Sequence, residues 1–199
     1  AKNLGKQRRS AAKKLVKTAG AILDSLAMGH CVLEVALCAR NSDAPHPHGG
    51  EDVEFLISTN PGAPPQPLGK IASGGELSRI SLSIQVISAG SDTTPTMIFD
   101  EVDSGIGGGV AEIVGQKLRT LGSDRQVLCV THLPQVAALA NHQLQVSKLA
   151  GEDTTHTRIR PLDETERVDE IARMLGGVEI TERTRAHARE MINRARRAG

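Results

Sequence analysis

Two short apolar segments, separated by an amphipathic stretch, limit most strongly how this chain can fold. Residues 96–99 and 126–131 are predicted strands, and residues 109–121 have the apolar spacing of a helix. A strand that returns to the same sheet through a helix runs parallel to its predecessor. The sequence therefore predicts an α/β fold with a parallel-sheet core.

Other elements are expected on both sides of this unit. Before it we expect a helix through about residue 28, a hairpin of strands 32–39 and 52–59, a proline- and glycine-rich connection 60–72, and a helix over about 75–88 that buries Leu77, Ile80, Ile84 and Ile87. After it we expect a short helix from Pro134, a second hairpin of strands 142–149 and 155–161, and two helices over about 165–175 and 181–197. Gly176-Gly177 should stop the first of these two helices, and Thr181 should cap the second.

Composition narrows the class of protein. Of the 199 residues 39% are hydrophobic and 24% charged, which is typical of a globular protein. No apolar run reaches the roughly 20 residues of a membrane span, and the three cysteines form no disulfide pattern. We therefore expect a cytoplasmic protein without a membrane partner.

Charge is distributed unevenly along the chain. Residues 1–28 carry a net charge of +6 and residues 182–199 a net charge of +4, which leaves −9 for the segment between them. Basic ends fit a protein that touches a polyanion such as DNA, and they fit two solvated helix faces equally well. Phe55 and Phe99 are the only aromatic residues, which argues against gripping single strands by base stacking.

The first motif that could carry chemistry is Ser73-Gly74-Gly75-Glu76, at the start of a predicted helix. Ser73 and Glu76 have the spacing of a capping box, so a well-capped helix is one interpretation. A cap needs no paired glycines, however, and glycines leave the amides of the first turn open to a phosphate. Both interpretations stay open for the motif taken alone.

The second motif is the acid pair Asp100-Glu101, directly after the apolar strand 96–99. Ligands of open parallel sheets bind beyond the carboxyl ends of the strands. One acid there can hold Mg²⁺ and its neighbour can orient or deprotonate a water. The alternative is a solvated strand end, which we disfavour because adjacent acids repel each other unless a cation intervenes.

His132 and Asp103 complete the set of candidates. His132 follows the strand 126–131, so it should lie at the same edge of the sheet as the acid pair, where it could contact a phosphoryl group. Asp103 begins an Asp-Ser-Gly sequence, which without context indicates an ordinary turn.

Taken in order, these features resemble the second half of an ABC-type ATPase head: SGGE is similar to the signature motif, MIFDE to the Walker B strand, Asp103 to the D-loop and His132 to the H-loop histidine. The stretches SGGELSRISLSIQ, IFDEVDSGIGG and CVTHLPQVAALA resemble the RecN family of SMC-like bacterial ATPases in DNA double-strand-break repair. The resemblance is strong over about residues 60–148. It implies a C-terminal head lobe over 29–199 and, over 1–28, the end of a coiled-coil helix that enters the head.

The resemblance also implies a division of labour between residues. In such ATPases the nucleotide lies between two heads. Ser73, Gly74, Gly75 and Glu76 would face the nucleotide of the partner head, and Asp103 would communicate across the dimer. The cofactors implied are ATP and Mg²⁺, with Asp100 holding the metal, Glu101 acting as the catalytic base and His132 contacting the γ-phosphate.

One part of such a head is missing from the sequence. A P-loop requires G-x-x-x-x-G-K-[ST], and the best match, at Gly69-Lys70, has Pro64 at its first glycine and Ile71 at its last position. We therefore expect this chain alone to be inactive and to need an N-terminal half that carries Walker A, removed or present as a separate chain. The other partners implied are a second copy through the heads, DNA and the RecA recombinase, in a nucleoid-associated protein.

Three alternatives stay open at this point. The chain could be a degenerate, non-enzymatic head that docks DNA or a partner, or part of an ABC transporter. Lys148 and the arginine-rich last helix could bind DNA phosphates. A metal site of His30, Cys31, His46 and His48 is disfavoured, because a proline-rich loop gives poor ligand geometry.

Overall fold

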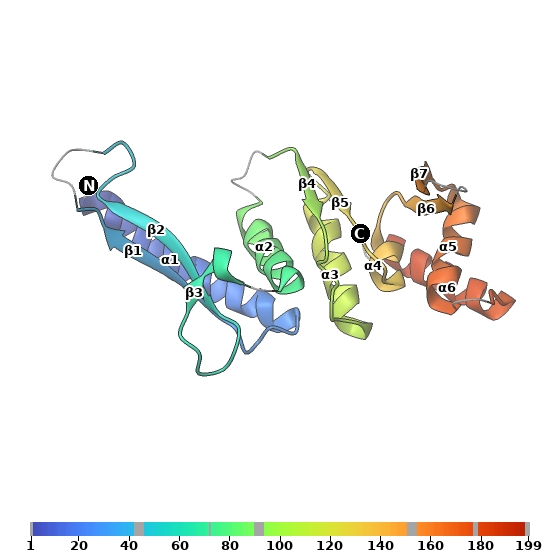
Figure 1. Ribbon diagram of the computed structural model, residues 1–199, viewed down its shortest axis with the longest axis horizontal. Coiled ribbons are helices and arrows are strands. Elements are labelled where there is room, and N and C mark those ends of the chain that lie inside the picture. The colour runs from blue at the N-terminus through green and yellow to red at the C-terminus, as the bar shows by residue number, and fades with distance from the viewer. Residues whose placement is uncertain are drawn as a thin grey trace.

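A computed structural model describes residues 2–41, 46–71, 73–89, 94–150, 155–176 and 179–197. In these ranges it has an N-terminal helix with a hairpin, a central α/β unit and a C-terminal helical part, which follow one another along the longest axis (Figure 1). Each part has a core cluster of its own.

The N-terminal part is the helix α1 (Lys2–Ser25) packed against an antiparallel hairpin of β1 (Val32–Ala39) and β2 (Glu51–Ser58). The predicted hairpin is confirmed within one residue. The helix ends at Ser25 rather than near residue 28, and Leu26 and Met28 are buried in the turn that follows it. Apolar residues on one side of α1, among them Ala19 and Leu23, form a core with Leu33 and Ile57 of the hairpin.

The connection expected over residues 60–72 contains more structure than predicted. A two-residue strand, β3 (Gln66–Pro67), pairs antiparallel with β2, and a 3-10 turn, η1 (Leu68–Lys70), follows it. Proline is tolerated here because β3 is an edge strand. The proline-rich composition indicated a loop and hid this short pairing.

The central part contains the predicted strand–helix–strand unit. Strand β4 (Thr96–Phe99) pairs in parallel with β5 (Gln126–Cys129), and α3 (Gly108–Leu121) connects them. The strand β5 ends two residues earlier than expected. Met97 and Phe99 point into a core that α3 and the preceding helix, α2 (Gly74–Ser88), both help to form.

Helix α2 joins the first two parts. Ile80 packs in the N-terminal core and Leu82 in the central one. The expectation that Leu77 is buried is wrong, because this side chain is 39% exposed. Leu77 lies in the first turn of the helix, on the side away from both clusters.

The C-terminal part begins with α4 (Pro134–Leu139), which packs on α3 and on the two final helices, α5 (Glu164–Gly176) and α6 (Glu182–Arg197). Thr181 caps α6 as predicted, since its Oγ1 accepts a hydrogen bond from Thr184 N–H at 3.2 Å. The helix α5 ends at Gly176, and Gly177 lies outside the described residues.

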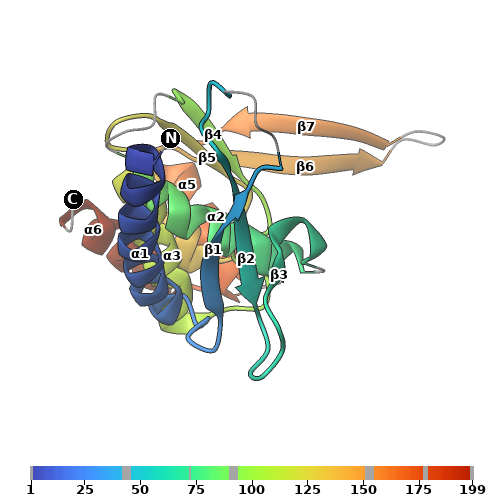
Figure 2. The same cartoon turned by 90° about the vertical axis from the view of Figure 1, so that its left-hand side faces the viewer.

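The second predicted hairpin is confirmed as β6 (Leu144–Ala150) paired with β7 (Thr155–Pro161). It forms a ribbon that extends beyond the rest of the molecule (Figure 2). Among the described residues, no helix is both long enough and apolar enough to cross a membrane.

Candidate functional site

The carboxyl ends of β4 and β5 place the predicted catalytic residues at one edge of the sheet. The parallel register aligns Phe99 with Cys129, and Val130 N–H donates to Phe99 O at 2.9 Å just beyond the strands. The segments that start at Asp100 and at Val130 therefore leave the sheet side by side. Both Asp100 and Glu101 are exposed.

A buried carboxylate joins these two segments. Asp103 is only 2% exposed, and its Oδ2 accepts hydrogen bonds from Thr131 Oγ1 at 2.5 Å and from His132 N–H at 3.2 Å. The Nδ1 atom of His132 lies 3.5 Å from the same oxygen, while 72% of the His132 side chain is exposed. The hydrogen bonds of Asp103 thus hold the segment that carries His132 against the segment that carries the acid pair. His132 therefore lies at the same edge of the sheet as the acid pair, as expected.

The start of α2 docks against the same acid-bearing segment. Ser78 Oγ donates to Asp100 O at 2.6 Å, and the buried Arg79 donates from Nη1 to Ser104 O at 2.7 Å. The Gly-Gly pair therefore lies beside the acids that follow β4. These contacts of Ser78 and Arg79 are not evident from the sequence, because a polar helix residue is normally expected to face solvent.

Burial lowers the pKa of Arg79, while nearby Glu76 and Asp103 favour the charged guanidinium. A buried cation needs such partners, and here they are a carbonyl of the acid-bearing segment and two carboxylates. Arg79 therefore fixes the first turns of α2 to residues 102–104. The signal for this contact in the sequence is only its place one turn after the glycines.

Each glycine of the pair permits a close approach. A Cβ atom at Gly74 would overlap Glu101 Oε2, and one at Gly75 would lie 2.9 Å from Ser104 Cβ and 3.2 Å from Glu101 O. The Glu101 carboxylate thus rests against the N-terminal turn of α2, where the positive end of the helix dipole favours a negative charge. An alanine at either position would disturb this contact.

The cap of α2 is only half of the predicted box. Ser73 Oγ accepts a hydrogen bond from Glu76 N–H at 3.3 Å. Among the described residues, no bond returns from Ser73 N–H to the Glu76 carboxylate. A capping box does not involve the amides of Gly74 and Gly75, which belong to the first helical turn and have no partner within the helix.

The acid pair has a geometry of its own. Asp100 Oδ1 accepts a hydrogen bond from Glu101 N–H at 2.9 Å, and Glu101 has a φ of 57°, in the left-handed region that side chains rarely adopt. This turn directs the two carboxylates to different neighbours.

Groups of three or more potential metal ligands are absent from the described residues. One exposed carboxylate nevertheless fits Mg²⁺, which keeps most of its waters and binds through one or two protein oxygens. The metal site considered for His30, Cys31, His46 and His48 gains no support.

Cys129, at the end of β5, is the remaining polar group beside the site. Burial, and then the charges of Asp103 and Asp100, raise the pKa of its thiol to about 12. A thiol with so high a pKa is neutral at physiological pH, which argues against a nucleophilic role because only the thiolate attacks.

One face of the β4–β5 sheet is apolar and exposed. Ile98 is 70% exposed, Val130 62% and Leu128 41%, whereas the alternate residues of both strands pack in the central core. Exposed aliphatic residues on a strand face are a typical packing surface.

Comparison with known proteins agrees with this geometry. No family model matches the sequence. The chain is 53% identical over 192 residues to a DNA repair protein RecN of Xylella fastidiosa (strain 9a5c), and this alignment covers 96% of the chain and 34% of that protein. It is 48% identical over 194 residues to the DNA repair protein RecN of Vibrio cholerae, again with 96% and 34% covered. The chain belongs to the RecN family.

More distant relatives agree. The chain is 42% identical to the DNA repair protein RecN of Bacillus subtilis over 208 residues, which covers 98% of the chain and 36% of that protein. The chain thus spans about a third of the length of the curated relatives it matches. Membership of this family also decides against the transporter alternative.

Solved structures show the same fold. The Smc head domain with a coiled coil and joint from Pyrococcus yayanosii superposes with a TM-score of 0.56 at 18% identity, covering 83% of this chain and 29% of that one. The Smc head of Pyrococcus furiosus bound to the C-terminal domain of ScpA has a TM-score of 0.50 at 17% identity, covering 84% and 39%. The fold is that of an SMC-type ATPase head, as predicted.

Proposed function

We propose that this chain supplies the signature helix and the two catalytic segments of an SMC-like ATPase head that acts in DNA double-strand-break repair. Its relatives at 42% to 53% identity are named DNA repair protein RecN, and its fold is that of the Smc heads. The observation that carries the proposal is the junction at Asp103. This one buried carboxylate joins the acid-bearing segment to the His132 segment, and α2 docks on the former.

In this proposal the edge of the sheet holds the hydrolytic residues. Glu101 is the general base that takes a proton from the attacking water, and Asp100 would hold Mg²⁺. His132, whose ring is exposed while its backbone is tied to Asp103, would donate to the γ-phosphate. When bound, Mg²⁺ would neutralise phosphate charge as bond cleavage begins.

The N-terminal turn of α2 would serve the nucleotide of a second head. The turn formed by Ser73, Gly74, Gly75 and Glu76 offers a positive helix end and the amides of its two glycines, since the Glu76 amide already donates to Ser73 Oγ. Such a turn suits a γ-phosphate. The carboxylate of Asp103 is buried, so its part in communication across the dimer would be indirect. A shift of the α2 start would reach His132 through the acid-bearing segment and Asp103.

The partners of this head are part of the proposal. They are the part of the head that carries Walker A, a second head, DNA and the RecA recombinase, in a nucleoid-associated cytoplasmic protein. Exposed basic residues on α1, such as Lys6, Arg9 and Lys13, support contact with DNA phosphates. The exposed apolar face of the β4–β5 sheet supports a packing partner for the sheet.

The test is Glu101→Gln in the full-length protein. We expect ATP hydrolysis to fall by roughly a hundredfold to ten-thousandfold, as is usual when a general base is removed, while ATP binding persists. Glu54→Gln, an exposed carboxamide variant on β2, is the matched control and should hydrolyse ATP normally. If the two variants turn over ATP at the same rate, Glu101 is not the base. This chain alone, without a P-loop, should show no hydrolysis above background.

A further inference from the structure

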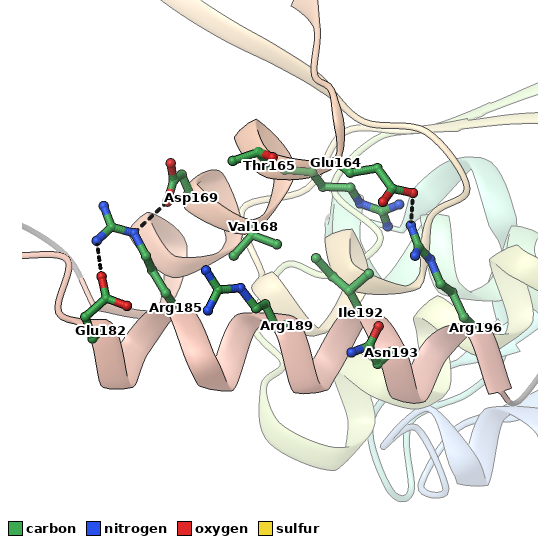
Figure 3. A pocket seen from close by; sticks show the side chains of 11 residues that line it. Glu164, Thr165, Val168, Asp169, Glu182, Arg185, Arg189, Ile192, Asn193 and Arg196 are labelled. Carbon is green, nitrogen blue, oxygen red and sulfur yellow. Dashed lines mark hydrogen bonds and ion pairs between the residues drawn. The ribbon is translucent and has the colours of Figure 1, made fainter.

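A hollow lies far along the chain from the candidate nucleotide site. It is a groove of about 470 Å³ between α5 and α6, which we call the α5–α6 groove (Figure 3). Val168 and Ile192 form an apolar floor, and charged side chains stand around it. None of the residues assigned to nucleotide or metal lines this groove.

The charges of the α5–α6 groove are mostly paired. Arg185 Nε lies 2.8 Å from Asp169 Oδ1, and Arg185 Nη1 lies 2.8 Å from Glu182 Oε1. At the other end, Arg196 Nη2 lies 2.5 Å from Glu164 Oε1. The three carboxylates of the lining thus share two arginines, which are held in place and leave one negative charge uncompensated at the rim.

Arg189 is the exception. It stands between the two sets of ion pairs, one helical turn after Arg185, and its guanidinium is directed at the groove (Figure 3). Within the described ranges it has neither a hydrogen bond nor an ion pair. The neighbouring arginines already have carboxylate partners, so the Arg189 guanidinium is left free to bind the carboxylate of a ligand above the apolar floor.

The groove also carries an excess of positive charge at its base. Arg167 is buried and donates to Ala137 O at 3.3 Å and to Ala138 O at 3.0 Å, while its buried Nε has no partner in the described structure. A smaller hollow of about 70 Å³ adjoins the groove through Arg167 and Arg196 and adds Arg119. Burial, and then the charges of Arg196 and Arg119, lower the pKa of Arg167. An added negative charge would relieve this repulsion.

We propose that the α5–α6 groove is a docking site for an acidic peptide segment of a partner protein, with Arg189 binding its carboxylate and Val168 and Ile192 receiving a neighbouring apolar side chain. The groove holds no nucleotide residue, so this site is independent of the ATPase assignment.

The lining favours a peptide over nucleic acid. Glu164, Asp169 and Glu182 stand at the rim and would repel a run of phosphates, whereas a single carboxylate can meet Arg189 alone. The apolar floor has no use for a sugar–phosphate backbone, but it suits an aliphatic side chain. A peptide with acidic and aliphatic residues side by side matches both features.

A selection from a random peptide library on the immobilised full-length protein tests this proposal. We expect the enriched peptides to share acidic and aliphatic residues. Arg189→Glu should weaken their binding roughly tenfold to a hundredfold, the worth of a charge-assisted hydrogen bond. Arg183→Glu, on the exposed side of the same helix and outside the groove, makes the same charge change and should bind them as the unaltered protein does.

The opposite results are equally clear. The proposal is overturned if no peptide is enriched, if the enriched peptides lack carboxylates, or if Arg189→Glu binds them as Arg183→Glu does. A labelled DNA duplex is titrated in parallel. If Arg189→Glu weakens duplex binding more than Arg183→Glu does and leaves peptide binding unchanged, the groove is a nucleic-acid surface instead. Arg189→Gln, with thermal unfolding of all variants, separates loss of contact from loss of fold.

Discussion

Helices α2 and α5 begin with the same spacing of capping residues, but different capping hydrogen bonds form at the two helix starts. At α5 the box is closed, because Glu166 N–H donates to Asp163 Oδ1 at 2.8 Å and Asp163 N–H donates to Glu166 Oε2 at 3.0 Å. Arg160 binds the same Glu166 carboxylate. At α2 only the bond from Glu76 N–H to Ser73 Oγ forms, at 3.3 Å.

The difference fits our proposal that the start of α2, unlike that of α5, receives a phosphate group. At α5 the first turn contains Glu164 and Thr165, and the capping box provides acceptors for the N–H groups of Asp163 and Glu166. At α2 the first turn contains Gly74 and Gly75, whose lack of side chains admits the Glu101 and Ser104 segment. A capping pattern in sequence is therefore not enough to tell the two apart. The residues between the two capping positions decide.

The largest expected effect comes from adding a methyl group at Gly75, where α2 lies against the acid-bearing segment. In Gly75→Ala the new methyl group would lie 2.9 Å from Ser104 Cβ and 3.2 Å from two backbone oxygens. We expect the free energy of unfolding to fall by about 1–3 kcal/mol, as for other overpacked sites, and ATP hydrolysis by the full-length protein to fall with it. Thr165→Ala at the same position of α5 should stay within about 0.5 kcal/mol. Equal losses in urea unfolding would remove the distinction between the two helix starts.

A smaller effect is expected from removing each cap. Asp163→Ala breaks a closed box and should cost about 1–2 kcal/mol of unfolding free energy, toward the upper end for caps. Ser73→Ala breaks a single long bond and should cost about 0.5–1 kcal/mol, toward the lower end. Chemical unfolding of both variants measures this order. A reversed order would mean that α2 is capped more tightly than its geometry indicates.

The smallest effect is a pH dependence at α5. The hydrogen bond from Asp163 N–H, and then the bond from Arg160, lower the pKa of Glu166 below its usual value of 4.5. A depressed carboxyl pKa stabilises the fold above the ordinary value, and this stabilisation is lost as the pH falls through the lowered one.

In Glu166→Gln the fall in melting temperature on acidification below about pH 4.5 should accordingly be shallower. Glu76→Gln is the matched change at α2, where the carboxylate accepts no hydrogen bond from a described group, and it serves as the control. Parallel slopes for the unaltered protein and Glu166→Gln would show that the box contributes nothing to the acid response.

Sequence reasoning located the helices and strands closely, because glycines, prolines and caps mark their ends. Pro134 starts α4 and Thr181 caps α6, as local rules require. Strands 96–99 and 126–131 were predicted from apolar runs bounded by polar residues, and only the end of the second differs, at Cys129. The short pairing at Gln66–Pro67 was missed, since it depends on a neighbouring strand rather than on local preference.

The sequence predicted which candidate residues follow the two strands at one edge of the sheet, but it did not predict the contacts between them. The order of the motifs indicated Asp100, Glu101 and His132 at one edge. No local pattern shows that Thr131 binds Asp103, or that the buried Arg79 ends on a carbonyl 25 positions later. The unpaired Arg189 was hidden for the same reason, since sequence cannot tell which arginines of a basic helix find partners.

The left-handed backbone at Glu101 lowers the stability of the fold at the residue to which we assign the proton transfer of ATP hydrolysis. A residue with a side chain in this region costs the fold on the order of 1–3 kcal/mol, and glycine at the same place would avoid that cost. The most stable residue for position 101 is therefore one that could take no proton from water. With Glu101 as the base that we propose, selection for stability and selection for ATP hydrolysis would favour different residues at this position.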